Sequence, residues 1–234
     1  MGVDVPAYRQ MIGVQNESSL HRALKNMYAG CGGETEVKTD GYVCDCMDDS
    51  GGIVEIQTGS FAPLRGKLSK LSGKARIKIV YPVIEEKYIA LYDGCGIPVR
   101  RRKSPKKGCK WDIFNALVYA PELPLIPGIS IEIVVVDVLE KRRADGKGSW
   151  RRGGVSIVDR LLQNYKYAIP LQGPQDYMQF LPFMSNETFT AAALAARAGI
   201  RTNLARKTAY VLERLNLVEQ TGKSGRSKLF RVAA

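Results

Sequence analysis

The sequence lacks several features that would place it in large classes of protein. Its 234 residues include only five cysteines, an odd number, and no amino-terminal apolar segment resembles a signal peptide. We therefore expect a cytoplasmic protein with reduced thiols. Long hydrophobic runs are also missing, since the longest apolar stretch, residues 129–139, is interrupted by Glu132 and Asp137. No segment is therefore expected to span a membrane.

Acidic residues become scarce after the first third of the chain. The formal net charge is +12, yet residues 1–99 hold 11 basic and 12 acidic side chains. Residues 100–110 contribute +7, residues 141–166 hold 8 basic and 2 acidic side chains, and residues 185–234 hold 9 and 3. Three basic blocks favour a polyanionic partner, most often nucleic acid, because neutralised phosphates release counterions. Solubility alone is the competing explanation.

The apolar pattern of the first third predicts an α/β arrangement. Leu20, Leu24 and Met27 follow Glu17 at helical spacing, and Gly30 marks the end of this helix. Turn residues then separate further elements. These are strands at about 34–38, 41–47 and 53–57, a helix from Pro63 to Gly73, and strands at 75–82 and 87–92. The order predicts a mixed β-sheet covered by helices, and the 45% hydrophobic residues can fill its core.

The most distinctive stretch is the hairpin DCMDDSGGIVEIQ, residues 45–57. The turn reverses the chain, so Asp45 on one strand can meet Glu55 on the next, with Gln57 on the same face as Glu55. Two carboxylates beside a polar side chain suit a hard divalent cation and an activated water. A solvated acidic turn is the alternative. Cys44 and Cys46 flank Asp45 and face away from it, which favours core packing over a zinc pair.

These residues carry a resemblance to a known fold. The helix with Glu17, the strand with Asp45, the tripeptide Glu55-Ile56-Gln57 and the helix after it resemble the core of the PD-(D/E)XK nucleases. More closely, a set of runs is similar to largely uncharacterised bacterial proteins that join such a core to a carboxy-terminal winged helix. The runs are LHRALKNMYAG, DGYVCD, IKIVYPV and, most specifically, VEIQTGSF. The resemblance covers most of the chain and implies a restriction-endonuclease-like mixed sheet flanked by helices.

The resemblance also implies a catalytic site. Asp45 and Glu55 would bind Mg²⁺ or Mn²⁺, Gln57 would orient the attacking water, and Glu17 would be the acid of the first helix. Gln57 departs from the superfamily, in which lysine is commoner, and brings no positive charge to the transition state. The following helix offers Lys67 or Arg65 as a source of that charge, although both also suit a solvated helix face.

Two residues near the first helix have competing explanations. Glu17 either supports the amino terminus of the helix through the macrodipole or reaches towards the hairpin. His21 lies one turn after Glu17. We expect it to pair with a carboxylate on the helix surface, and a catalytic role is the weaker alternative.

Two basic segments follow the core. Residues 100–110, RRRKSPKKGCK, are expected to form a loop that contacts phosphate non-specifically. A helix at about 111–120 and a strand at 129–139 separate this loop from a glycine-rich hairpin at 141–159. A tryptophan beside arginines suits base stacking with guanidinium groups on phosphates, whereas a tryptophan covering the core edge is the alternative. The DNA-binding residues expected in this hairpin are Lys147, Trp150, Arg151 and Arg152.

The carboxy-terminal region resembles a winged helix. Thr190 is expected to cap one helix that stops at Gly199, and Thr202 to cap a second, followed by a basic hairpin. In a winged helix the second helix enters the major groove, although such domains also bind proteins. The residues expected on the DNA-binding side are Thr202, Asn203, Arg206, Lys207, Tyr210, Lys223, Arg226 and Lys228.

The expected organisation is a nuclease-like domain (1–166), a linker (167–184) and a winged-helix domain (185–234). The sequence predicts a DNA-binding, metal-dependent endonuclease that hydrolyses phosphodiester bonds in duplex or branched DNA, without membrane contact. A homodimer is compatible with this activity, because many nucleases that cut both strands act in pairs. A catalytically inactive nuclease-fold regulator that binds DNA is the alternative, and an RNA-processing nuclease is a third hypothesis.

Overall fold

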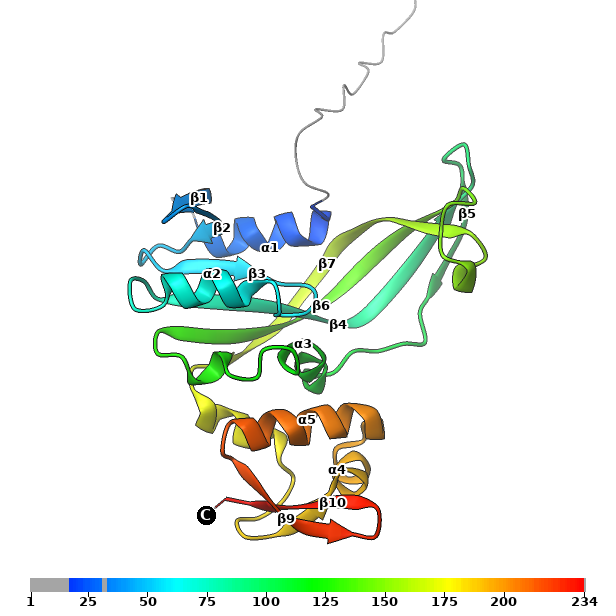
Figure 1. Ribbon diagram of the computed structural model, residues 1–234. Coiled ribbons are helices and arrows are strands. Elements are labelled where there is room, and N and C mark those ends of the chain that lie inside the picture. The colour runs from blue at the N-terminus through cyan, green and yellow to red at the C-terminus, as the bar shows by residue number, and fades with distance from the viewer. Residues whose placement is uncertain (1–16, 31–32, 234) are drawn as a thin grey trace, which may run out of the picture.

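The computed structural model describes residues 17–30 and 33–233. The amino-terminal elements follow the order helix, three strands, helix, two strands (Figure 1). They are α1 (Ser19–Ala29), β1 (Thr35–Thr39), β2 (Tyr42–Met47), β3 (Ile53–Ile56), α2 (Leu64–Leu71), β4 (Ile77–Tyr92) and β5 (Pro98–Lys103). The three short strands and both helices confirm the predicted elements, although the strands expected at 75–82 and 87–92 form one continuous strand, β4.

The remainder of the chain alternates long strands with short helices before the carboxy-terminal unit. Its elements are η1 (Lys110–Ile113), α3 (Phe114–Leu117), η2 (Leu123–Leu125), β6 (Ile129–Ala144), η3 (Trp150–Arg152), β7 (Val155–Leu171), η4 (Pro174–Phe180), β8 (Thr188–Thr190), α4 (Ala191–Ala198), α5 (Thr202–Arg214), β9 (Val218–Ser224) and β10 (Ser227–Val232). The helix expected at 111–120 is instead a 3-10 turn followed by one short α-helix.

Among the described residues, seven strands form a mixed sheet in the order β1-β2-β3-β4-β6-β7, with β5 paired to β4. The pairs β3/β4 and β4/β6 are parallel, and the other neighbouring pairs are antiparallel. Helices cover this sheet, so the predicted α/β class with a mixed sheet flanked by helices is confirmed. The seven-stranded sheet is the frame that positions every candidate site residue of the amino-terminal region.

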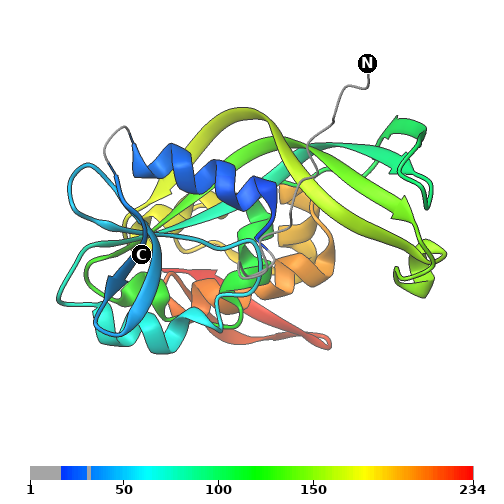
Figure 2. The same cartoon turned by 90° about the horizontal axis from the view of Figure 1, so that it is seen from above.

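The two faces of the sheet bury different helices because side chains alternate along each strand. On one face, Leu20 and Leu24 of α1 pack against the β6 residues Val134, Val136 and Val138. On the other face, the leucines of α2 and the residues of α3 pack against the odd-numbered isoleucines of β6. Figures 1 and 2 show α1 on one side of the sheet and α3 on the other. The helical spacing of Met27 with Leu20 and Leu24 predicts that all three face inward, but Met27 is 47% exposed, so the prediction is wrong for Met27.

Beyond the helices, the long strands continue as a projecting arm, which comprises residues 84–103 of β4 and β5 and residues 137–160 of β6 and β7 (Figure 1). β4, β6 and β7 contain 16, 16 and 17 residues. Strands of this length extend roughly 50 Å. The basic stretch expected to be a loop is therefore in part a strand, because residues 98–103 pair with β4 as an edge strand.

The segment 167–184, expected to be a linker, is part of the folded interior. β7 extends to Leu171, and η4 buries Tyr177 and Phe180. The rings of Phe114 and Phe180 meet edge-on with centroids 5.0 Å apart. Because Pro174 begins a 3-10 turn and the aromatic side chains after it pack inward, one continuous core joins the sheet to the carboxy-terminal unit.

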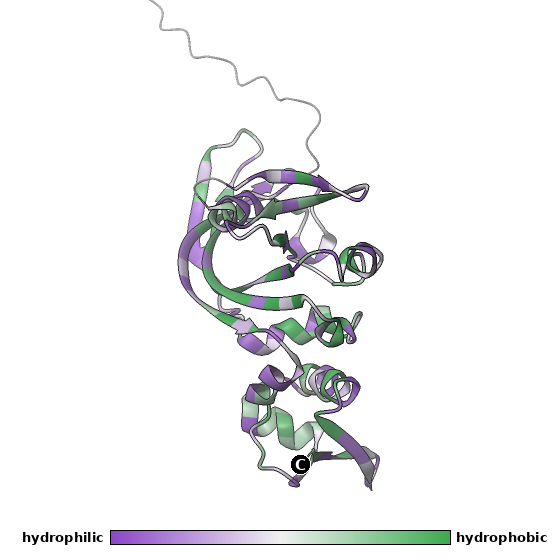
Figure 3. Cartoon of the chain, turned by 90° about the vertical axis from the view of Figure 1, so that its left-hand side faces the viewer, coloured by the Kyte–Doolittle hydropathy of each residue, from purple (hydrophilic) through white to green (hydrophobic). Residues whose placement is uncertain are grey.

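The carboxy-terminal unit packs α4 and α5 on a three-stranded sheet of order β8-β10-β9. The Thr190 hydroxyl accepts a hydrogen bond from Ala193 N–H, which confirms Thr190 as the cap of α4. Thr202 does not cap α5, because it is the first helical residue and Arg201 occupies the cap position. Figure 3 shows hydrophobic residues where these elements meet and hydrophilic residues over the distal half of the β9–β10 hairpin.

In the part of the chain that the structure describes, no helix is both long enough and apolar enough to cross a membrane.

Candidate functional site

The predicted site begins at the start of α1. Ser18 caps the helix, its hydroxyl accepting a hydrogen bond from His21 N–H at 3.3 Å. Ser19 donates to the carboxylate of Asp159 on β7 through both its backbone N–H (2.9 Å) and its hydroxyl (2.5 Å). These contacts fix the first turn of α1 against the sheet. Glu17 lies just before the helix, so its carboxylate is free of the helix backbone and turns towards the side chain of His21.

His21 is the centre of the site, although little in the sequence favoured its selection. Its Nδ1 lies 2.6 Å from Oε1 of Glu17, and its Nε2 lies 3.2 Å from Oδ2 of Asp45 and 3.0 Å from the carbonyl oxygen of Ile56. Both ring nitrogens therefore face acceptors, which requires a proton on each. The hydrogen bond to Asp45 raises the pKa of His21 to about 9, since it and the bond to Glu17 outweigh burial. At neutral pH His21 is an imidazolium.

Asp45 lies where β2 separates from β3. The ladder pairs Cys46 with Val54, and Asp45 and Glu55 occupy the next positions on the two strands. Burial alone would raise the pKa of Asp45, but hydrogen bonds from His21 and from Ile56 N–H (2.7 Å) outweigh it and lower the pKa. Asp45 is thus an ionised carboxylate held by one cation and one backbone donor.

Glu55 is only 5% exposed and points towards α2. The Lys67 ammonium contacts its Oε1 and also donates to the carbonyl of Val43 at 2.6 Å. Burial raises the pKa of Glu55, and Lys67 and the backbone N–H of Asp45 act in the opposite direction. The two carboxylates of the hairpin therefore lie next to the last paired residues of β2 and β3 and have separate cationic partners, which come from helices on opposite faces of the sheet. We call Glu17, His21, Asp45, Glu55 and Lys67 the carboxylate cluster.

Of the two predicted sources of positive charge on α2, only Lys67 reaches the cluster. Arg65 instead pairs with Glu122 at 2.5 Å, and both of these side chains are largely exposed. Lys67 and Glu55 are almost buried, with 12% and 7% of their side chains exposed. The solvated-face alternative is therefore confirmed for Arg65 and wrong for Lys67.

Gln57 does not turn towards the carboxylates in this structure. Its side-chain amide donates to the carbonyl oxygen of Ser60 at 2.5 Å, and its backbone N–H bonds to the carbonyl of Val80 at 2.9 Å. The amide is therefore engaged in the turn that leads from β3 to α2. Hydrogen bonds through His21 join Glu17 to Asp45, and Glu55 bonds to Lys67. Gln57 takes part in neither set of contacts.

The oxygen atoms of the cluster have the chemistry that a hard divalent cation requires. Asp45 and Glu55 supply carboxylate oxygens and Ile56 a carbonyl oxygen, and these donor types suit Mg²⁺ or Mn²⁺. His21 and Lys67, however, already occupy them. Across residues 17–30 and 33–233, no group of three or more His, Cys, Asp or Glu side chains is arranged to hold a metal. The donor types therefore fit a metal, and in this structure the imidazolium and the ammonium are the partners of these groups.

The hairpin turn itself is structural. Asp48 Oδ1 accepts from the backbone of Ser50 (3.0 Å) and Gly52 (2.8 Å), and this stabilises the reversal between β2 and β3. Cys44 and Cys46 are buried free thiols, so core packing is confirmed for both. Burial raises the pKa of each thiol. Neither side chain therefore acts as a thiolate at neutral pH.

The predicted nucleic-acid residues of the 141–159 hairpin lie at the end of the arm. Trp150 is 83% exposed, so the alternative in which it covers the core is wrong. The guanidinium of Arg151 lies over the Trp150 ring, 5.5 Å from its centroid. Lys147, Arg151 and Arg152 are exposed as well. An exposed ring beside three cations forms a surface suited to bases and phosphates.

The predicted residues of the carboxy-terminal unit are mostly open to solvent. On α5, Asn203, Arg206 and Tyr210 share one exposed face. Lys207 was predicted there too, but its ammonium is directed at α3 and donates to Asn115 Oδ1 at 2.8 Å. The other predicted residues are also exposed. They are Thr202, Lys223, Arg226 and Lys228.

His21 is the residue of the candidate site that sequence reasoning did not place there. Its spacing of four from Glu17 correctly predicted their pairing. The contact with Asp45 joins residues 24 positions apart, and nothing local in the sequence indicates it. Packing of α1 on the β2–β3 hairpin creates this contact.

Comparisons with known proteins cover the same region. A family described as Domain of unknown function (DUF8091) matches residues 18–172, which include the β2–β3 hairpin, α2 and the arm. An uncharacterized protein of Treponema pallidum (strain Nichols) is 31% identical over 216 residues, which span 92% of this chain and 85% of that protein. No solved structure matches the chain.

Proposed function

The chain belongs to the family described as Domain of unknown function (DUF8091), and we propose that it is a DNA-binding, metal-dependent endonuclease with a PD-(D/E)XK-like core. The order α1-β1-β2-β3-α2-β4 supports this, since it contains the first helix, the strand with Asp45, the strand with Glu55 and the helix after it, on which the resemblance of the sequence rests. The parallel pairing of β3 with β4 and the helices on both faces agree with a restriction-endonuclease-like sheet.

The observation that carries the proposal is the contact of Lys67 with Glu55. Gln57 lacks the positive charge that the superfamily commonly has at that position, and Lys67 supplies an ammonium from α2 instead. The ammonium is nearly buried and lies beside the strand end that carries Asp45. A fixed cation in a poorly solvated site stabilises negative charge that develops on a phosphate.

Each residue of the carboxylate cluster would have a separate role in hydrolysis. Asp45, Glu55 and the carbonyl of Ile56 would hold Mg²⁺ or Mn²⁺, which when bound supplies Lewis-acid activation of the phosphate and of a water. His21 orients Asp45 and the Ile56 carbonyl, and Glu17 in turn orients the imidazolium. Lys67 orients Glu55 and contributes its charge to the phosphate.

The proposal includes the carboxy-terminal unit as a winged helix that locates the duplex. The order β8-α4-α5-β9-β10 supports it, because it contains the two helices and the hairpin of that fold. The exposed face of α5 with Asn203, Arg206 and Tyr210 suits entry into a major groove. The hairpin residues Lys223, Arg226 and Lys228 suit contact with the flanking phosphates.

The test is incubation of the full chain with supercoiled, linear and branched DNA, with Mg²⁺, with Mn²⁺ and with chelator. We expect metal-dependent cleavage, and Asp45→Asn and Glu55→Gln each to reduce its rate by at least about a hundredfold. Asp49→Asn is the matched control, since Asp49 is an exposed carboxylate in the turn of the same hairpin. Cleavage at the parent rate by either cluster variant would contradict the assignment.

A second candidate is a catalytically inactive DNA-binding protein of the same fold. The observation in its favour is that Asp45 and Glu55 already have cationic partners and that the Gln57 amide bonds to Ser60. Calorimetry with Mg²⁺ and Mn²⁺ separates the two candidates. Tight duplex binding without metal uptake or cleavage favours the inactive binder, and preference for structured RNA at one fixed salt concentration favours the RNA-processing nuclease.

A further inference from the structure

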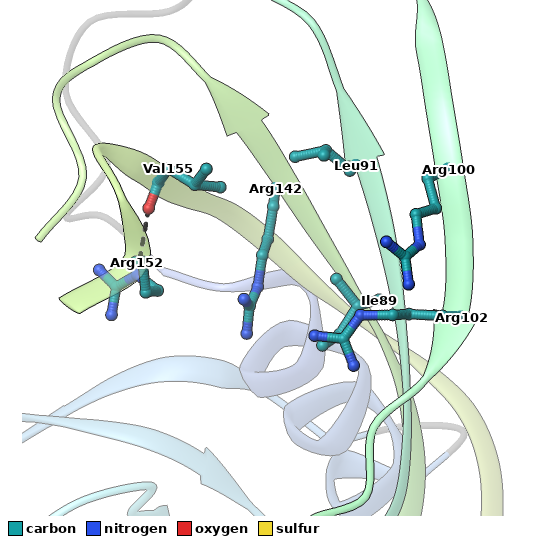
Figure 4. Close-up of a pocket in the computed structure, with 7 residues that line it drawn as sticks. All are labelled: Ile89, Leu91, Arg100, Arg102, Arg142, Arg152 and Val155. Carbon is teal, nitrogen blue, oxygen red and sulfur yellow. Dashed lines mark hydrogen bonds between the residues drawn. The ribbon is translucent and has the colours of Figure 1, made fainter. Parts of the chain in front are cut away.

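A groove on one face of the arm is lined by arginines from β5, β6 and η3. Its lining includes Ile89 and Leu91 of β4, Arg100 and Arg102 of β5, Arg142 of β6 and Arg152 of η3 (Figure 4). The ladder explains why they converge, because Arg102 pairs with Ile89 and Arg100 with Leu91, and Leu91 also pairs with Arg142 on its other side. Residues paired across neighbouring strands share a face. Figure 4 shows the guanidinium groups around a common space.

Two of these guanidinium groups are held in place by the protein itself. Glu140 is fully buried and its Oε1 accepts from Nε (2.8 Å) and Nη2 (2.6 Å) of Arg142, while its Oε2 accepts from Arg160 at 3.0 Å. Nε of Arg152 donates to the carbonyl of Val155 at 3.1 Å. Side chains that are ordered beforehand lose less conformational entropy when a ligand binds.

The guanidinium groups of Arg100 and Arg102 have no such partner in the part of the chain that the structure describes. Across residues 17–30 and 33–233, no ion pair or hydrogen bond engages the side chain of Arg100 or Arg102, and both are exposed. Guanidinium groups bind phosphate in a bidentate manner. A groove with two fixed and two unpaired arginines is therefore suited to phosphate groups that come from outside the protein.

The groove lies on the sheet face that carries α1. Alternate residues of β6, from Val134 to Val138, pack against the leucines of α1, and Glu140 and Arg142 continue the same alternation. The amino end of α1 is bonded to Asp159 on β7, and His21 follows two residues after Ser19. A chain of phosphates in the groove would thus continue towards the end of α1 at which the carboxylate cluster lies.

We propose that this arginine groove binds the backbone of duplex DNA next to the carboxylate cluster, at a site separate from the winged helix. The inference rests on the proposed function and adds the position of the backbone. The chemistry favours a polyanion with regularly spaced phosphates, because the guanidinium groups line a concave groove. A membrane surface would instead require the charges on one flat, outward face.

The test measures duplex binding by the full chain in the presence of chelator, over a series of salt concentrations. The variant is Arg100→Ala combined with Arg102→Ala, two exposed residues on an edge strand. We expect affinity about tenfold lower, and a slope of log K against log salt that is smaller by about 2, as two lost phosphate contacts require.

The matched control is Arg101→Ala combined with Arg143→Ala. Both residues are exposed on the arm and pair with Ala90 and Tyr92, so they lie on its opposite face. The control removes the same charge, and we expect it to weaken binding less than about threefold and to leave the slope almost unchanged. Equal losses for the two variants overturn the groove, because they would show that only the overall charge of the arm matters. Circular dichroism and thermal melting should give the parent result for both variants.

Separate measurements distinguish this inference from the proposed function. Duplex binding in chelator does not depend on cleavage. If the parent protein does not cleave DNA but the Arg100→Ala, Arg102→Ala variant loses duplex affinity, the result supports the groove and contradicts the proposed hydrolase activity. Cleavage that depends on Asp45 and Glu55, combined with equal losses for the two arginine variants, supports the hydrolase and overturns the groove. Binding to phosphatidylserine–phosphatidylcholine vesicles in place of duplex DNA, or no duplex binding by the parent, also overturns the groove.

Discussion

The carboxylate cluster and the arm differ in how their charges are paired. In the cluster, Asp45 contacts the imidazolium of His21 and Glu55 contacts Lys67. On the arm, Arg100 and Arg102 have no such partner among the described residues, and Trp150 is exposed beside Arg151. A buried charge without a partner costs several kcal/mol, whereas water solvates an exposed one. The comparison therefore predicts that changes in the cluster alter stability and that changes on the arm alter binding.

The largest expected effect on stability comes from Lys67→Met. It leaves the buried carboxylate of Glu55 without its cation, and breaking a buried pair in this way costs about 3–5 kcal/mol of the free energy of unfolding. The second change Glu55→Gln should restore most of the loss, because it removes the unpaired charge. Urea unfolding of the single and double variants measures both effects.

Arg65→Met on the same helix is the control for Lys67. Its ion pair with Glu122 is largely exposed, so the expected loss is below about 1 kcal/mol. Similar losses for Lys67→Met and Arg65→Met would contradict the pairing of the cluster charges described above.

A smaller, pH-dependent effect is expected for His21→Gln. The folded-state pKa of about 9 lies above the value of 6.5 for a free histidine, so the ion pairs of His21 stabilise the fold fully below pH 6.5. This contribution, on the order of 2 kcal/mol, is lost as the pH rises through about 9. Unfolding curves of parent and variant should therefore differ most near pH 6 and converge by about pH 10. A difference in the free energy of unfolding that grows with pH would contradict the assignment of His21 as an imidazolium in the folded state.

The smallest effect on stability is expected for Trp150→Ala. Because Trp150 is 83% exposed, the free energy of unfolding should change by no more than about 0.5 kcal/mol. Duplex binding should nonetheless weaken by about 1 kcal/mol if the ring stacks on a base. Trp111→Ala is the matched control, since Trp111 packs edge-on against Phe180 and its loss should cost about 3 kcal/mol of stability. Losing stability through Trp150 would mean that the ring packs against the protein.

The sequence predicted the first third of the fold well because its signals there are local. Hydrophobic periodicity indicated α1 and α2, and the acidic turn indicated the β2–β3 hairpin with Asp45 and Glu55 on adjacent strands. Prediction failed where tertiary contacts override local signals. Residues 100–103 are four consecutive cations that repel one another, and Pro105 and Gly108 after them favour a turn. Pairing with β4 nevertheless makes residues 98–103 a strand. The proline-rich segment 167–184 resembled a linker, yet its first residues belong to β7, and Tyr177 and Phe180 are buried in the core.

The sequence alone determined which chemical groups the protein possesses and which of them lie near each other along the chain. The pairing of Glu17 with His21 and the order of helices and strands from α1 to α2 are of this kind. Tertiary structure alone decided that His21 reaches Asp45, that Lys67 and not Arg65 reaches Glu55, and that four arginines line one groove. Such contacts depend on strand register and on helix packing between distant segments. Burial of the whole core determines this register and packing, and no local sequence pattern encodes them.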